Sequence, residues 1–448
     1  MPFQDLYTLW QNEAAKCDRA HDYLTAKQTV RSTPVLAPPE LRTLYYTPLY
    51  WCEILTQAIE ERISITDVEC SVERVAKWLR SQWRDIDGDL LSSRVHTEAL
   101  AYGRAYVSVT TGEDGKPQAT MLTAKSTVHK MNPRTGELDE ALRVYGREGK
   151  LATLYQRGRT TWLQKVEGGW RVERQDDHGY SRVQIVVFSQ RSAKQDGYGA
   201  PVTRSIWGLQ DAGSRVSTDA AIAGALLAVP QRVIKGVTQD NKPKMSAEKM
   251  YLARLLTLSG KDASIEQFAA AQLQNFATLL NMYSKQAASS LGAPISLFGV
   301  ASDANPASGD AKAEDDSRIT RRAERIARDF TSSWELVLQL LLDFCPFPVT
   351  DEARRSATVA WLDPNKPTMA EGADMALKLA SAKYGPNERP LVSHQRILKM
   401  LGLSDEEILA ELDLIEEDEL TALLREPVEE DPSVSPTGDP APTGDPES

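Results

Sequence analysis

The stretch that decides the fold is residues 269–325, AAAQLQNFATLLNMYSKQAASSLGAPISLFGVASDANPASGDAKAEDDSRITRRAER. It contains two segments with helical periodicity, separated by a run of small, mostly uncharged residues at 297–316. Gly292 and Pro294 end the first helical segment, since proline cannot continue a helix. The small residues offer little apolar surface to bury, so we expect an exposed loop between two long helices.

Apolar side chains recur at helical spacing on both sides of that loop. The first helix is predicted over Ser264–Leu291 and spans about 40 Å at a rise of about 1.5 Å per residue. The second is predicted over Glu314–Phe344, where an acidic EDD start suits the positive end of the helix dipole. Its apolar stripe is formed by Ile319, Ala323, Ile326, Phe330, Trp334, Val337 and Leu341.

Composition places the 448-residue chain among ordinary globular proteins, with 41% hydrophobic and 26% charged residues. Its apolar runs are too short to span a bilayer, and its first residues do not have the pattern of a secretory signal. The net charge of −11 is unevenly distributed. Residues 405–448 hold sixteen Asp or Glu and one Arg, a balance of −15, so the preceding 404 residues carry +4.

The order of predicted elements indicates an α+β fold. Residues 1–100 read mainly as helices, and 101–190 read as an antiparallel β module of six or seven strands, because apolar and polar residues alternate between turn signals. A helix over 202–229 follows. Further predicted elements are a short strand at 231–237, a small helix around 246–257, a strand at 358–362, and helices with capping-box spacing at Thr368 and Glu371 and at Ser404 and Glu407. The tail 426–448 is rich in Pro, Gly, Asp and Ser and is predicted to be disordered.

No motif for catalysis or metal binding stands out. The Gly115-Lys116 and Gly260-Lys261 pairs lack the rest of a phosphate-binding loop. The five histidines are isolated, and the four cysteines form no CxxC pair and are predicted to be reduced, buried thiols. There is no GxSxG or HExxH sequence. We therefore predict no catalytic residue, no metal site and no cofactor.

A basic face lies on the second long helix. It comprises Arg318, Arg321, Arg322, Arg325 and Arg328, at the spacings i, i+3, i+4, i+7 and i+10. Such a face can contact phosphates, meet acidic groups of a neighbouring subunit, or stay solvated. The sequence leaves these three alternatives open.

The chain resembles the portal proteins of tailed phages, particularly those of actinobacteriophages, from about Pro48 to about Leu424. The stretch 269–325 carries most of the resemblance, with Asn305, Pro306 and Ser308 matching the family's loop. Shorter similar pieces are AYGRAYV at 101–107, LQDAGSRVSTD, AVPQRVIKG at 228–236 and WLDP at 361–364. Each short piece is weak alone, but their order and spacing strengthen one another.

The resemblance implies a portal-like architecture with a helical stem, an antiparallel β wing, a small mixed clip and a helical crown. The implied parts are a wing over 1–200, stem helices over 201–229 and 264–292, a clip over 230–263, a tunnel loop over 293–313, a wing long helix and return strand over 314–365, a crown over 366–425, and the acidic tail over 426–448.

The resemblance also implies a function and a set of contacts. The protein would form a ring of twelve copies at one capsid vertex, assembled in the host cytoplasm, through which double-stranded DNA is packaged and ejected. Partners would be the terminase large subunit, a head-tail adaptor, and the major capsid and scaffolding proteins, with no membrane. The tunnel loop would face DNA through Val300, Ala301, Ser302, Asp303, Asn305, Pro306, Ser308, Gly309 and Asp310. The arginine face would contact DNA or a neighbouring subunit, and Lys235, Lys242 and Lys244 would contact clip partners.

Two alternatives belong to other classes of protein. One is a different neck or tail component of a phage, and the other is a DNA-processing enzyme whose acidic residues assemble from distant positions. Ring formation distinguishes the portal hypothesis from both.

Overall fold

The computed structural model of this chain contains two compact units, Met1–Pro364 and Asn365–Ser448. The residues that the structure describes are 2–28, 45–112, 115–180, 182–190, 197–227, 232–235, 255–258, 264–267, 273–299, 309–362, 376–379, 381–384, 389–390, 392–400 and 407–415. No helix within these ranges has the length and apolarity that crossing a membrane requires. The mixture of helices and antiparallel sheets confirms the predicted α+β class.

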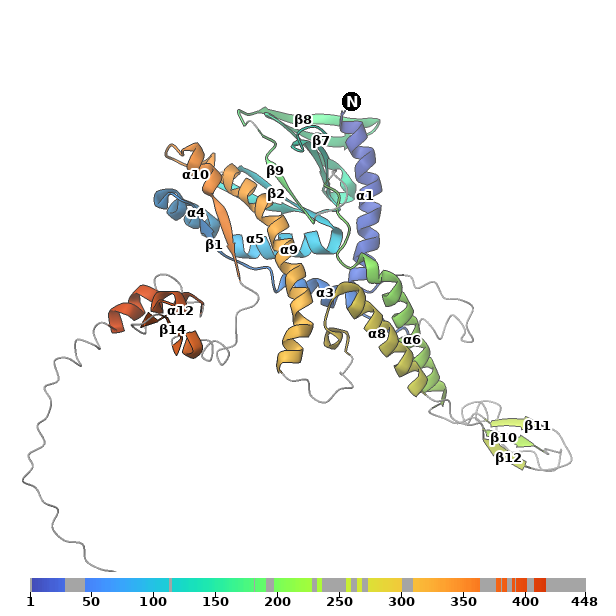
Figure 1. Ribbon diagram of the computed structural model, residues 1–448. Coiled ribbons are helices and arrows are strands. Elements are labelled where there is room, and N and C mark those ends of the chain that lie inside the picture. Colours follow the sequence, from blue (N-terminus) through green and yellow to red (C-terminus); the bar gives the residue numbers. More distant parts are fainter. Residues whose placement is uncertain are drawn as a thin grey trace, which may run out of the picture. The chain divides into compact units, whose positions relative to one another are not determined.

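Helices dominate the N-terminal part of the first unit, as the sequence predicts (Figure 1). They are α1 (Pro2–Leu24), α3 (Trp51–Glu60), α4 (Glu73–Asp85) and α5 (Gly88–Tyr102). Strand β1 (Ile65–Glu69), between α3 and α4, was not expected from the sequence. It pairs antiparallel with β13 (Thr358–Trp361) from the other end of the unit, which confirms the predicted strand there.

The β-rich part forms two antiparallel sheets, whereas the sequence predicts one module of six or seven strands. A three-stranded sheet has the order β3-β2-β9, and a five-stranded sheet has the order β4-β5-β6-β7-β8. The strands are β2 (Arg104–Thr111), β3 (Pro117–Leu122), β4 (Thr127–Met131), β5 (Leu138–Tyr145), β6 (Leu151–Gln156), β7 (Arg159–Val166), β8 (Gly169–Asp177) and β9 (Ile185–Ser189). Because β9 returns to pair with β2, the five-stranded sheet is an insertion within the three-stranded one.

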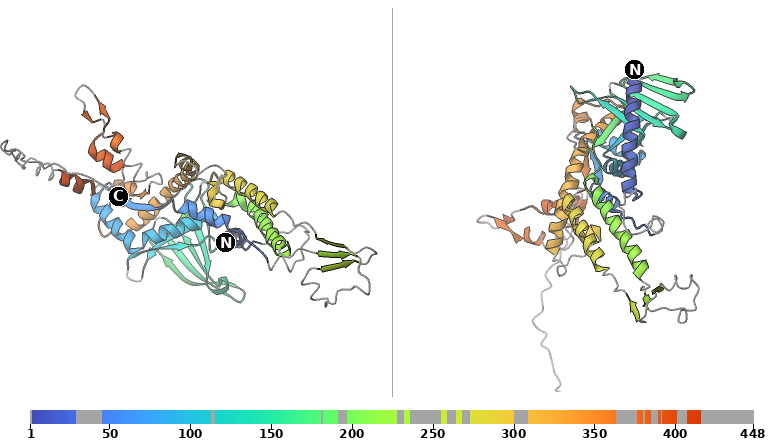
Figure 2. Two further views of the ribbon diagram at one scale, coloured as in Figure 1. Left: turned by 90° about the horizontal axis from the view of Figure 1, so that it is seen from below. Right: turned by 90° about the vertical axis from the view of Figure 1, so that its right-hand side faces the viewer.

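Two helices, α6 (Trp207–Leu227) and α8 (Gln274–Leu291), lie side by side (Figures 1 and 2). The first agrees with the helix predicted over 202–229. The second starts ten residues later than predicted, because residues 264–267 form strand β12. Pairing with another strand supplies the backbone hydrogen bonds of this segment, so periodicity alone misassigned it.

Strand β12 (Ser264–Gln267) belongs to a three-stranded sheet of order β11-β10-β12. Strand β10 (Arg232–Lys235) confirms the predicted short strand, and it pairs parallel with β11 (Leu255–Leu258) and antiparallel with β12. The prediction of a helix around 246–257 is wrong at its C-terminal end, because strand β11 begins at Leu255. The rest of that predicted helix lies outside the described residues.

Helix α9 (Gly309–Leu342) is the central element of the first unit. It begins five residues before the predicted start at Glu314, and its predicted apolar stripe is confirmed. All seven stripe side chains, from Ile319 to Leu341, are at most 4% exposed. The helix contacts α3, α4, β2, β9 and β13 (Figure 1), and α10 (Asp351–Ser356) follows it.

An aromatic cluster fixes the middle of α9. The Trp334 indole Nε1–H donates a hydrogen bond to Nε2 of His96 on α5, at 3.0 Å. The His96 ring stacks on Phe330 at 5.3 Å, and Phe188 of β9 meets Trp334 edge to face at 4.8 Å. Burial lowers the pKa of His96 to about 3, partly offset by a hydrogen bond with the Ile63 backbone, so the ring is neutral and can accept the Trp334 proton donor.

The backbones of two glycines, Gly103 and Gly199, lie close together where the chain passes from the β-rich part towards α6. Gly103, at φ +85°, ends α5, and a Cβ placed there would lie 2.5 Å from the carbonyl oxygen of Gly199. In turn, a Cβ on Gly199 would collide with the carbonyl oxygen of Gly103. The Val202 N–H donates to the Leu100 carbonyl at 3.0 Å. The segment before α6 is therefore held against the end of α5.

The second unit is only partly helical in its described residues. Strands β14 (Lys383–Tyr384) and β15 (Arg389–Pro390) form a small antiparallel pair that the predicted helical crown lacks. Helix α12 (His394–Met400) and the helical residues 407–415 agree with the prediction. Except for Glu407, the predicted capping-box residues lie outside the described residues, as does the tail 426–448.

We expect Gly199→Ala to lower the free energy of unfolding by at least about 2 kcal/mol, because its methyl group would overlap the Gly103 carbonyl. Gly208→Ala is the matched control, since a Cβ on this α6 glycine meets nothing within 4 Å. It should be neutral or stabilising by up to about 1 kcal/mol. Chemical denaturation of the full chain measures both changes. Equal stability of the two variants would show that the close approach is unimportant.

Candidate functional site

The predicted tunnel loop is shorter and better anchored than the sequence indicates. After α8, residues Ile295–Phe298 form the 3-10 helix η3. Phe298 is 6% exposed and meets the Trp51 ring edge to face at 5.6 Å, so this end of the loop belongs to the core. At the other end, Gly309 and Asp310 are the first residues of α9. The remaining predicted loop residues, Val300, Ala301, Ser302, Asp303, Asn305, Pro306 and Ser308, lie outside the described residues.

Four of the five predicted arginines line one open cleft of about 540 Å³ at the N-terminal half of α9. They are Arg318, Arg321, Arg322 and Arg325. Arg328 lies on the same helix but does not line the cleft. The other lining residues are Gln190, Leu291, Ile326 and Asp329. The structure thus turns a linear arginine pattern into a concave, positively charged surface.

Arg322 is the most buried of these four arginines. Its Nη1 donates a hydrogen bond to the Leu291 carbonyl at 3.2 Å, at the C-terminal end of α8. A cation there complements the negative end of the helix dipole. Burial lowers the pKa of Arg322, and the positive charge of Arg325 lowers it further. Arg322 therefore has a structural contact, while its neighbourhood concentrates positive charge.

Of the three predicted clip lysines, the structure describes only the backbone of Lys235. Lys235 ends strand β10 in the separate three-stranded sheet. Lys242 and Lys244 lie outside the described residues. Their proposed contacts with partners stay a prediction.

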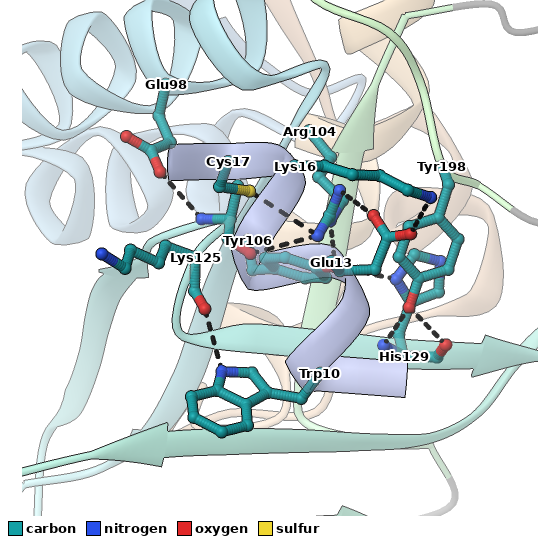
Figure 3. A network of polar contacts seen from close by, with 11 residues as sticks. Trp10, Glu13, Lys16, Cys17, Glu98, Arg104, Tyr106, Lys125, His129 and Tyr198 are labelled. Atoms are coloured by element: carbon teal, nitrogen blue, oxygen red, sulfur yellow. Dashed lines mark hydrogen bonds and ion pairs between the residues drawn. The ribbon is translucent and has the colours of Figure 1, made fainter. Parts of the chain in front are cut away.

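A second cluster of charged side chains, which the sequence did not reveal, is buried between α1, α5 and the β-rich part (Figure 3). Arg104 is 2% exposed, and its Nη1 donates to Glu13 Oε2 of α1 at 2.9 Å. Its Nε donates to the Tyr106 hydroxyl at 3.0 Å, and its Nη2 donates to the Ala124 carbonyl at 3.2 Å. The sequence signal was an arginine at the start of strand β2, directly before the apolar or aromatic residues Ala105, Tyr106 and Val107.

Tyr198 joins this cluster to the segment that precedes α6 (Figure 3). Its ring stacks on His129 at 4.5 Å, and its hydroxyl accepts from the His129 backbone N–H and donates to the His129 carbonyl, both at 2.8 Å. The Arg104 guanidinium lies over the Tyr198 ring, 4.6 Å from its centroid. These contacts fasten α1 and the approach to α6 onto β2 and β4. We interpret the cluster as structural, because its members satisfy one another.

Glu98 borders the same cluster. It accepts a hydrogen bond from the Ala124 N–H at 2.8 Å. Burial raises its pKa to about 7, against the smaller lowering effects of that hydrogen bond and of Arg104. Glu98 is therefore the described carboxyl group of this cluster whose charge changes near neutral pH.

Metal-binding and thiol chemistry find little support in the described part of the chain. No group of three His, Cys, Asp or Glu there is arranged to hold a metal ion. All four cysteines are free thiols; Cys17 and Cys52 are buried, and Cys70 and Cys345 are half-buried. Burial raises the pKa of Cys17 to about 11 and that of Cys52 to about 12, which disfavours the reactive thiolate.

Comparison with known proteins decides the family. Residues 64–422 match the family model described as "Phage portal protein, SPP1 Gp6-like". This chain belongs to that portal family. It is 29% identical to the "Portal protein" of Mycobacterium phage D29, covering 85% of this chain and 81% of the relative. It is 28% identical to the "Portal protein" of Mycobacterium phage L5, covering 95% and 90%.

Two solved assemblies are similar at 16% sequence identity and a TM-score of 0.45. One is "Virion of native gene transfer agent (GTA) particle", where the match covers 86% of this chain and 99% of that chain. The other is "Neck of native GTA particle computed with C12 symmetry", with 85% and 98%.

Family membership confirms the predicted resemblance and the prediction that the chain is not an enzyme. Portal proteins are structural components of the virion at the capsid. The functional surfaces of such a protein are contact surfaces, so the arginine cleft is the candidate site with the most definite geometry among the described residues.

We expect Glu98→Gln to change how stability depends on pH. In the native chain, the folded-state pKa of about 7 exceeds the usual 4.5, so Glu98 binds its proton more tightly when folded. Its contribution to the free energy of unfolding is full below pH 4.5 and is lost as the pH rises through 7. Glutamine has no proton to lose and keeps an acceptor for Ala124. The variant should gain about 3 kcal/mol relative to the native chain between pH 4 and pH 8.

Chemical denaturation at a series of pH values measures this gain. Glu173→Gln, at an exposed position on β8, is the control for the removal of one carboxyl group. Identical profiles for Glu98→Gln and the native chain would contradict the assignment.

Proposed function

We propose that the protein assembles into a closed ring of twelve copies at one capsid vertex and forms the channel for packaging and ejection of double-stranded DNA. The observation that carries this proposal is the family match over residues 64–422, together with relatives named "Portal protein" that align over most of their length. The ring is assembled in the host cytoplasm and then becomes part of the virion.

The parts of the chain have different roles in this proposal. Helices α6 and α8 form the stem, and the sheet β10–β12 forms the clip, which docks the terminase large subunit during packaging and the head-tail adaptor afterwards. The N-terminal helices and the β-rich part, residues 1–200, form the wing together with α9 and β13, and the wing meets the capsid and scaffolding proteins. Residues 366–425 form the crown.

Charge distribution supports a passive conduit. Each phosphate that a protein neutralises adds salt-dependent affinity, and tight binding would oppose sliding of the duplex. Residues 1–404 carry only +4. A near-neutral body reduces this resistance to DNA movement.

The loop between η3 and α9 is proposed to face the DNA. Support comes from its small residues and from the family's loop pattern at Asn305, Pro306 and Ser308. Phe298 on one side and α9 on the other give it fixed ends, so only residues 300–308 remain to approach the duplex. Such a loop can change without disturbing the core at its two ends.

Electron microscopy of the purified full chain tests the ring. We expect closed rings with an axial hole and about twelvefold symmetry, because identical head-to-tail interfaces close into rings. A persistent monomer, or an open filament, would contradict the proposed function and favour another neck or tail component.

Deleting residues 301–308 tests the loop. The deletion ends before α9, so rings should still form, while most capsids should fail to package or retain DNA. A same-length Gly-Ser replacement is the control for chain length. Failure of the deleted chain to form rings, when the Gly-Ser chain forms them, would show that the loop serves assembly.

A further inference from the structure

The arginine cleft presents an electrostatic problem that an anionic occupant would solve. Arg318, Arg321, Arg322 and Arg325 converge on one concavity. Burial, and to a smaller extent the like charge of Arg325 held in the same recess, lower the pKa of Arg322. Asp329 offers only a single carboxylate within the lining.

The shape of the cleft restricts the kind of anion that fits. Leu291 and Ile326, at 5% and 4% exposure, supply apolar side chains to the lining, whereas Arg318, Arg321 and Arg325 are exposed. A volume of about 540 Å³ suits several side chains of a peptide. The backbone of a DNA duplex is a rigid convex surface, so its phosphates can reach the exposed arginines but cannot fill a recess with apolar walls.

The sequence contains a segment with the complementary chemistry. Residues 416–431, EEDELTALLREPVEED, hold eight Asp or Glu and one Arg. Three leucines, Leu420, Leu423 and Leu424, lie between the two acidic clusters. Carboxylates can pair bidentately with guanidinium groups, and leucines can contact apolar walls.

We propose that the arginine cleft binds the acidic segment 416–431 of a second copy of this chain. The choice of a second copy as the source of this segment depends on the proposed ring, because a ring brings copies next to one another. The cleft and the segment themselves belong to the single chain. Occupation by carboxylates neutralises the arginines and leaves fewer cations to hold DNA phosphates. The contact would also link successive copies of the ring.

Peptide binding to the full chain tests the proposal. The protein carries Glu416→Gln, Glu417→Gln, Asp418→Asn and Glu419→Gln, so that its own segment competes less. A fluorescent peptide with the native sequence 416–431 is titrated at low salt, where surface electrostatics are strong, and anisotropy is recorded. We expect Arg321→Gln with Arg325→Gln to weaken peptide binding about tenfold, because two charge-assisted contacts are lost. Both side chains are exposed, so the fold should persist, and thermal unfolding checks this.

Arg328→Gln is the matched control, since Arg328 is exposed on the same helix and does not line the cleft. Peptide affinity should be nearly unchanged in this variant. If Arg328→Gln weakens binding as much per charge removed as the Arg321 and Arg325 pair does, the proposal is overturned, because binding then follows net charge alone. Absence of peptide binding would overturn it as well.

A labelled DNA duplex, titrated with the same variants, separates the two classes of anion. If the Arg321 and Arg325 changes weaken duplex binding strongly but leave peptide binding intact, the cleft is a DNA contact and the proposal fails. The ring is judged separately by microscopy. Rings without site-specific peptide binding would overturn this inference and leave the proposed function standing. Site-specific peptide binding by a chain that forms no ring would support the cleft as a binding site and overturn the proposed function.

Discussion

The structure of the first unit depends on burying one face of α9. Seven side chains of that face are almost completely removed from water, and each large one contributes roughly 1.5–3 kcal/mol of hydrophobic free energy. Helix α9 contacts helices α3 and α4, strand β13, and strands β2 and β9 of the sheet β3-β2-β9. These elements therefore share one core. The hydrogen bond from Trp334 to His96 adds direction to this otherwise nonspecific burial, because it satisfies the indole N–H only when α5 and α9 are correctly aligned.

Local patterns predicted the elements but not their partners. The α9 stripe and strand β13 were predictable because helical and extended periodicities leave strong signals over these lengths. The pairing of β13 with β1 joins opposite ends of the unit, and the division of the strands into two sheets depends on β9 returning to β2. Neither relation has a local signal. The strand at Ser264–Gln267 shows the same limit, since its conformation comes from pairing with β10.

The candidate site was predictable to a similar degree. Spacing placed the arginines on one face of α9, but it did not distinguish Arg328 from the four that line the cleft. That difference depends on Leu291 and Gln190, which come from distant parts of the sequence. Spacing also could not show that Arg322 reaches the end of α8, or that Arg104 meets Glu13 in the core. Such contacts are properties of tertiary packing.

The insertion of one sheet within another has a consequence for the order of folding during synthesis. Strand β2 is the central strand of its sheet, and its partner β9 emerges from the ribosome only after β4 to β8 have been made. Until then, one edge of β2 has no strand partner. The apolar residues Val107 and Val109 also stay without the part of their core that α9 supplies. Contacts so distant in sequence form slowly and leave unpaired edges open to aggregation.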